Sequence, residues 1–280
     1  MSAGRRALGI AQLSLVGTAP PDLVLLAAQA GFDFIGARVR PVTGAERPYD
    51  LQPGSPMLAE TLVRMQDTGV AVRDIEFLLL DGSDQRDAWL RMMEAGAALG
   101  AGSLTVAGCD PDRIRLADTL ARMTEDGRSH GIVPTLEPIS YQPINSLPAA
   151  ADLARQTGCR IIVDTLHFHR FGGTLDELAA AAGLVPLVQL CDGPRQPPAD
   201  REGLVLESRV ERGVPGEGQF GLAEVIAALP PELPVSVEAP SDSAVASVGE
   251  LSWARRLKAS ADRVLAEAAA LHPAVIERKA

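Results

Sequence analysis

Residues 132–168 read IVPTLEPISYQPINSLPAAADLARQTGCRIIVDTLHF. The apolar run Ile132–Pro138 predicts a strand, and the apolar residues within Leu147–Gln156 recur at the spacing of a helix. Gly158 follows this segment at a position where glycine commonly ends a helix, and Arg160–Phe168 forms a second apolar run. The stretch therefore predicts a strand, a helix and a second, parallel strand, which is the repeating unit of an α/β protein.

The same alternation extends along the whole chain. Strands are predicted at Leu8–Leu15, Phe32–Val39, Val70–Leu80, Ser103–Ala107, Ile132–Pro138, Arg160–Phe168, Leu184–Cys191 and Pro234–Ala239. Helices are predicted at Pro21–Ala30, Met57–Asp67, Asp87–Ala98, Pro111–Asp126, Leu147–Gln156, Leu175–Ala182, Leu222–Leu229 and Val248–Leu271. Eight strand-helix units in 280 residues predict a single (β/α)8 TIM barrel. An open doubly wound sheet more often has about six strands and a Gly-rich turn after the first.

We expect one domain over residues 1–280, because no linker or change of composition divides the chain. Two long loops interrupt the regular pattern, at about residues 41–56 after the second strand and 192–220 after the seventh. Long loops on the catalytic face of a barrel usually act as lids. We call residues 192–220 the lid.

Charge and composition exclude several classes of partner. The net charge of −10 opposes binding to nucleic acid, whose affinity depends on clustered basic residues. No segment approaches the roughly 18 uninterrupted apolar residues of a membrane span. Three widely spaced cysteines in apolar runs indicate reduced thiols and a cytoplasmic location. Helices with broad apolar stripes leave a homodimer as one option.

Polar side chains stand where the last four predicted strands end, at Glu137, Asp164, Gln189 and Glu238. Any one of them could be a solvated strand end, but a barrel enzyme draws its reactive groups from these ends. Their oxygen atoms and three negative charges suit Mg²⁺, Mn²⁺ or Co²⁺, with positions left open for a bidentate substrate. The four together therefore predict a metal site that binds a small molecule.

Three further residues are candidates for the same pocket. His167 lies three residues after Asp164 at the expected mouth of the barrel, although packing against Phe168 would also explain it. Arg38 follows the second strand and Glu76 lies within the third. A solvated loop explains Arg38 as well as a substrate contact does.

The chain resembles the xylose isomerase-like TIM barrels, the sugar phosphate isomerase/epimerase family, over most of its length. The residues that carry the resemblance are Glu137 in LEP, Asp164 and His167 in VDTLH, Gln189, Asp192 and Arg195 in VQLCDGPR, Glu217 in PGEGQF, and Glu238 in VEAP. The resemblance implies a single divalent metal bound by Glu137, Asp164, Gln189 and Glu238. It further implies that the two glutamates act as acid and base, and that His167 and Arg195 bind the substrate.

The chain departs from many epimerases of this family at strand seven, where Gln189 stands in place of a histidine. In this respect it resembles hydroxypyruvate isomerases and some 3-dehydroshikimate dehydratases. The amide oxygen of Gln189 is a harder ligand than the imidazole nitrogen of a histidine, so this replacement favours Mn, Mg or Co over Zn.

The expected activity is that of a divalent-metal-dependent isomerase or epimerase. Its substrate would be a sugar, ketose or hydroxy-keto acid, converted through a metal-bound enediolate with His167 in support. Two alternatives remain open at this point. One is a metal-dependent dehydratase of the 3-dehydroshikimate dehydratase type, and the other is a non-catalytic sugar-binding barrel.

Overall fold

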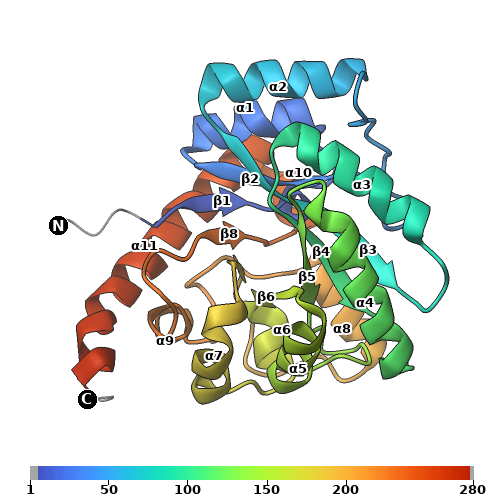
Figure 1. Ribbon diagram of the computed structural model, residues 1–280. Helices are drawn as coiled ribbons and strands as arrows, with labels where there is room; N and C mark the ends of the chain where they lie inside the picture. Colours follow the sequence, from blue (N-terminus) through green and yellow to red (C-terminus); the bar gives the residue numbers. More distant parts are fainter. Residues whose placement is uncertain (1–5, 278–280) are drawn as a thin grey trace.

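The computed structural model describes residues 6–277, so residues 1–5 and 278–280 of the expected domain lie outside it. Eight short parallel strands pair in chain order, and β1 also pairs with β8 (Figure 1). They are β1 (Leu8–Ile10), β2 (Phe34–Arg38), β3 (Ala71–Leu80), β4 (Ser103–Gly108), β5 (Val133–Glu137), β6 (Arg160–Asp164), β7 (Leu187–Leu190) and β8 (Val235–Val237). This closed ring confirms the predicted (β/α)8 TIM barrel.

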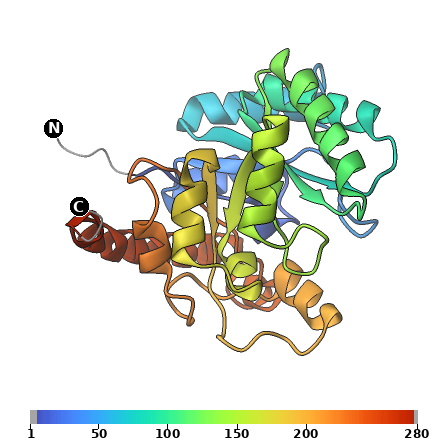
Figure 2. The ribbon, with the colours of Figure 1, turned by 60° about the horizontal axis from the view of Figure 1, so that its bottom comes forward.

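Helices surround the barrel, as the two views show (Figures 1 and 2). They are α1 (Pro20–Ala30), α2 (Pro56–Thr68), α3 (Arg86–Leu99), α4 (Arg113–Arg128), α5 (Leu147–Thr157), α6 (Thr165–Arg170), α7 (Leu175–Ala181), α8 (Arg201–Val210), α9 (Leu222–Ala227), α10 (Asp242–Val248) and α11 (Glu250–Glu277). Helix α11 packs against both α9 and α1. Within residues 6–277, none of these helices is long and apolar enough to cross a membrane.

The structure differs from the predicted elements mainly near the strand ends. The first predicted strand is shorter, because Gln12–Leu15 form a 3-10 helix after β1. The sixth ends at Asp164, whose carboxylate accepts a hydrogen bond from the Leu166 N–H at 2.7 Å and caps α6. Helix α8 lies inside the lid, and α10 lies between β8 and the last predicted helix; neither was predicted.

Apolar side chains fill one end of the barrel. Phe34 and Leu187 are the first residues of their strands and pack against Ile162, although β2 does not pair with β6 or β7. These side chains therefore meet inside the ring. Gly9 permits this packing, since a Cβ at that position would overlap the Phe34 ring. These apolar groups close the amino-terminal end, while the buried Glu137, Asp164 and Glu238 stand at the carboxyl ends of their strands.

One carboxylate joins α3 to α4. Asp126 accepts two hydrogen bonds from the Arg86 guanidinium, at 2.9 and 2.7 Å, and one from the indole N–H of Trp89 at 3.0 Å. Hydrogen bonding to Arg86 is the largest cause that lowers the pKa of Asp126 to about 2, and the bond to Trp89 adds to it. The ionised form of Asp126 is therefore the form that the fold favours.

We predict that Asp126→Asn lowers the free energy of unfolding at neutral pH, because Arg86 and Trp89 lose a charged acceptor. The folded pKa of about 2 lies below the unfolded value of about 3.9. The ionised carboxylate therefore stabilises the fold above about pH 4, and this contribution is lost as the pH falls toward 2.

Urea unfolding of both proteins at about pH 7 and about pH 3 measures this effect. The difference between wild type and Asp126→Asn should narrow in acid, while the exposed Asp118→Asn on the same helix should differ little at either pH. A difference that stays constant with pH would contradict the assignment.

Candidate active site

A cavity of about 260 Å³ lies at the carboxyl ends of the strands. Its polar lining includes Arg38, Glu76, Glu137, His167, Gln189, Arg212 and Glu238. Each of these residues is at most 5% exposed. Charges held away from water in this way interact more strongly than they would at a surface, so their arrangement decides what the cavity can bind.

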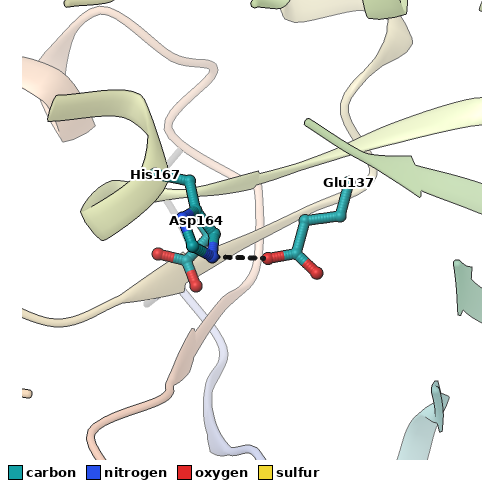
Figure 3. Close-up of side chains that lie close together, drawn as sticks. All are labelled: Glu137, Asp164 and His167. Carbon is teal, nitrogen blue, oxygen red and sulfur yellow. Dashed lines mark ion pairs between the residues drawn. The ribbon is translucent and has the colours of Figure 1, made fainter. Parts of the chain in front are cut away.

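Glu137, Asp164 and His167 form a tight cluster at the cavity (Figure 3). Glu137 ends β5, Asp164 ends β6, and His167 lies in the helix that Asp164 caps. One ligand atom from each residue lies within 4.8 Å of the other two, and His167 Nε2 is 3.7 Å from Glu137 Oε1. The helix that starts directly after β6 thus brings an imidazole back to the strand ends.

The His167 ring is fixed from its other side. Its Nδ1 lies 3.2 Å from the Ser140 hydroxyl, and the Tyr141 ring packs edge-on against it at a centroid distance of 5.6 Å. Burial lowers the pKa of His167 to about 4, so the imidazole is neutral near pH 7. A neutral imidazole can offer a nitrogen lone pair to a proton or a metal ion.

Glu137 has the environment of an acid–base group. Burial, followed by the neighbouring charge of Asp164, raises the pKa of Glu137 to about 8. A carboxyl group with such a pKa exchanges its proton readily near neutral pH. Of the predicted catalytic residues, Glu137 and His167 are in contact with each other. The third, Glu238, follows β8 and lines the same cavity.

Arg212 lies between two of the predicted metal ligands. Its Nη1 is 2.5 Å from Asp164 Oδ2 and 2.9 Å from Glu238 Oε2, and it donates to the Glu238 carbonyl oxygen at 3.2 Å. Its Nε donates to the Ser208 carbonyl oxygen at 2.8 Å. Burial alone would lower the pKa of Arg212, but the two carboxylates raise it well above its usual value. The guanidinium is therefore a fixed positive charge.

The two carboxylates that share Arg212 respond differently. Burial opposes ionisation of both, but the charge of Arg212 lowers the pKa of Asp164, which also accepts a backbone hydrogen bond. Burial raises the pKa of Glu238 well above its usual value despite the same guanidinium. The positive charge of Arg212 therefore offsets the cost of burying the Asp164 carboxylate, which is nearer, more fully than it offsets the cost of burying the Glu238 carboxylate.

Gln189 is tied to the same network. Its Nε2 donates to Glu238 Oε1 at 2.7 Å. Its Oε1 is buried and has no hydrogen-bond partner in the described part of the chain. A buried carbonyl oxygen without a partner is costly, so this atom is available to a substrate hydroxyl or a cation.

Arg38 and Glu76 line the opposite part of the cavity from β2 and β3. Arg38 Nη2 is 3.5 Å from Glu76 Oε2, and Nη1 is 3.4 Å from Glu46 in the 41–56 loop. Within residues 6–277, Arg38 Nε and both carboxylate oxygens of Glu76 lack a hydrogen-bond partner. These long contacts leave hydrogen-bonding capacity for a bound molecule.

The structure does not bring Arg195 to the other predicted residues. Arg195 is exposed and does not line the cavity, and its backbone N–H donates to Gln219 within the lid. Arg212, which sequence reasoning missed, supplies the arginine instead. The available signal was electrostatic, because several buried carboxylates need a counter-charge, but no local pattern singles out Arg212 among the basic residues of the lid.

Asp192 holds the lid together and does not face the cavity. Its carboxylate accepts the backbone N–H groups of Gly193 at 2.8 Å, Gly216 at 3.0 Å and Phe220 at 3.1 Å. Both ends of the lid are therefore fastened to one buried side chain. Arg170 adds a second fastening through its ion pair with Glu207 in α8.

A sequence model of the family described as "Xylose isomerase-like TIM barrel" matches residues 24–266. No curated protein sequence matches the chain significantly.

Several solved structures share the fold. The IOLI protein, crystallised with a bound zinc atom, has a TM-score of 0.76 and 18% identity, over 93% of this chain and 98% of that one. D-Allulose 3-epimerase from Methylomonas sp. in complex with D-allulose has a TM-score of 0.68 and 15% identity, over 94% and 97%. The probable 3-DHS dehydratase AsbF from Bacillus anthracis has a TM-score of 0.71 and 13% identity, over 91% and 97%. At these identities the likeness concerns the fold.

We predict that Asp192→Ala loosens the lid. Three backbone N–H groups would lose their acceptor, two of them on the buried residues Gly193 and Phe220, which should lower the free energy of unfolding by about 2 kcal/mol or more. Limited proteolysis should cleave within residues 193–219 faster than in the wild type. The exposed Glu202→Ala, at the start of α8, is the matched control. Equal cleavage rates for Asp192→Ala and wild type would show that Asp192 does not hold the lid.

Proposed function

Since the chain belongs to the xylose isomerase-like TIM barrel family, we propose that it is a divalent-metal-dependent isomerase or epimerase. Its substrate is a sugar, ketose or hydroxy-keto acid. The observation that carries this proposal is the meeting of two buried glutamates, Glu137 from β5 and Glu238 from β8, at one cavity that also holds a neutral imidazole. Such paired carboxylates suit the movement of a proton between neighbouring carbon atoms.

The cavity supports a small polyhydroxylated substrate. The cavity has a volume of about 260 Å³. Arg38 and Glu76 line one side of it, and their unpaired hydrogen-bonding atoms can orient hydroxyl or carboxyl oxygens of a substrate. Leu13, Phe77 and Ile139 contribute apolar walls that keep bulk water away. The surrounding carboxylates disfavour a phosphate group.

The reaction follows from where the proton donors and acceptors stand. One glutamate removes the proton from the carbon between a carbonyl and a hydroxyl group, which leaves an enediolate. For isomerisation, the other glutamate returns a proton to the neighbouring carbon, and the hydroxyl proton passes to the former carbonyl oxygen. For epimerisation, it returns a proton to the opposite face of the same carbon. His167 and Arg38 line the cavity and can stabilise the oxygen atoms as charge develops on them.

The residues present fit a divalent ion. Glu137, Asp164 and His167 each offer a ligand atom within 4.8 Å of the others, and the free Oε1 of Gln189 and the carboxylate of Glu238 are the additional donors that the sequence predicts. When bound, the ion would supply positive charge that makes the substrate carbon more acidic. The predominance of oxygen donors favours Mn, Mg or Co, and the His167 nitrogen makes zinc the comparison to include.

We predict that the protein exchanges a carbon-bound hydrogen of its substrate with solvent. Incubation with Mn²⁺ and a panel of ketoses, hydroxypyruvate and dehydroshikimate in D₂O, followed by NMR, detects deuterium next to the carbonyl. Glu137→Gln and Glu238→Gln should each reduce turnover by about 10²–10⁴-fold, because each removes an acid–base group. Glu211→Gln, the same change at an exposed position of the lid, should leave turnover unchanged.

The product distinguishes the outcomes. An aldose–ketose pair indicates an isomerase, inversion at one carbon indicates an epimerase, and loss of water indicates the dehydratase alternative. If a ligand binds but its hydrogens never exchange, the acid–base assignment is wrong and the barrel is a binding protein.

A further inference from the structure

We propose that Arg212 is a built-in counter-cation that competes with the divalent ion for Asp164 and Glu238, so that the ion binds fully only when the Arg212 side chain withdraws. This inference rests on the metal site of the proposed function and concerns what controls its occupancy. It assigns to the lid, which carries Arg212, a role in metal binding.

The competition arises because one carboxylate belongs to two clusters. Asp164 is part of the Glu137–Asp164–His167 cluster, and its Oδ2 is also 2.5 Å from Arg212 Nη1. Its other oxygen, Oδ1, already accepts the Leu166 N–H. An ion bound at Asp164 therefore meets a guanidinium on the same side chain, in surroundings where like charges repel strongly.

Glu238 is occupied in the same way. Its Oε1 accepts from Gln189 Nε2 at 2.7 Å, and its Oε2 is 2.9 Å from Arg212 Nη1. The four ligands expected from the sequence are therefore not all free at once. Glu137 and the Oε1 of Gln189 are not paired with Arg212, whereas Asp164 and Glu238 are. Withdrawal of this single side chain would release an oxygen of both carboxylates.

A second cavity could receive the Arg212 side chain after it withdraws. Arg212 also lines a second cavity of about 600 Å³ next to the first, together with Glu217, Trp253 and Arg256. Glu217 in that cavity already pairs with Arg256 at 2.5 Å and could accept a second guanidinium. The Arg212 backbone N–H donates to the Pro240 carbonyl oxygen at 3.0 Å and fixes the backbone, while withdrawal of the side chain breaks the hydrogen bond from Nε to the Ser208 carbonyl oxygen.

Calorimetric titration of Mn²⁺ into the metal-free protein tests the competition directly. Arg212→Met should bind Mn²⁺ with a Kd at least tenfold lower than the wild type. Arg255→Met removes the same charge from an exposed position that lines neither cavity, so its Kd should match the wild type. Arg212→Lys keeps a cation without the fork of the guanidinium, and its Kd should lie between those of the wild type and Arg212→Met.

Thermal unfolding distinguishes a change in metal affinity from a folding defect of the variant. Without metal, Arg212→Met should melt below the wild type, because two buried carboxylates lose their partner. Addition of Mn²⁺ should raise its Tm by more than it raises that of the wild type, since the ion then takes the place of the missing charge.

Fluorescence of the protein with Arg212 intact supplies an independent readout. Trp253 lines the second cavity, and in a Trp89→Phe background it is the sole tryptophan. Diamagnetic Mg²⁺ should shift its emission when the guanidinium enters that cavity. The shift should be absent when Arg212→Met is added to the same background.

The outcomes separate this inference from the proposed function. Equal Kd values for wild type and Arg212→Met, or weaker binding by Arg212→Met, would overturn the competition while the metal site stands. Absence of binding to wild type and all variants would overturn both. A Trp253 emission that does not respond to Mg²⁺ in protein that binds it would show that Arg212 does not withdraw.

Discussion

Burial of several carboxylates at one end of a barrel is the constraint on which the rest of this structure depends. Glu76, Glu137, Asp164 and Glu238 are all at most 5% exposed, and either nearby positive charge or uptake of a proton makes such burial tolerable. Arg38 and Arg212 provide part of it. These two arginines do not offset all of the negative charge, and the pKa values of Glu137 and Glu238 are raised. Burial is the largest cause of both shifts. A site with this excess of negative charge attracts protons and cations, and both properties suit the enolisation that we propose.

The lid connects this electrostatic requirement to the fold. It begins directly after β7, is fastened at both ends by Asp192, and carries Arg212 back to the strand ends. Helix α8 within the lid is held by the Arg170–Glu207 ion pair, so the segment that precedes Arg212 is anchored. Small changes in the lid would therefore alter the charge beside Asp164 and Glu238 as well as access to the cavity.

The sequence predicted the barrel and the strand-end residues because both depend on local patterns. Glu137, Asp164 and Glu238 each follow an apolar run, and parallel strands bring such positions together. Helix α6 was missed because its residues continue the apolar run of β6, although Asp164 is a recognisable cap. Arg212 was missed for a different reason. Its position depends on how a long lid folds back, and Arg195, nearer to the strand in sequence, ends on the surface.

The central claim is that a divalent ion binds at the buried carboxylates and imidazole. The most direct measurement is a crystal structure of the protein soaked in Mn²⁺, with diffraction recorded at the manganese absorption edge. We predict an anomalous peak in contact with Glu137, Asp164 and His167, with the Arg212 side chain moved away from Asp164. An Arg212 that still bridges Asp164 and Glu238, with no anomalous peak at these residues, would contradict the account.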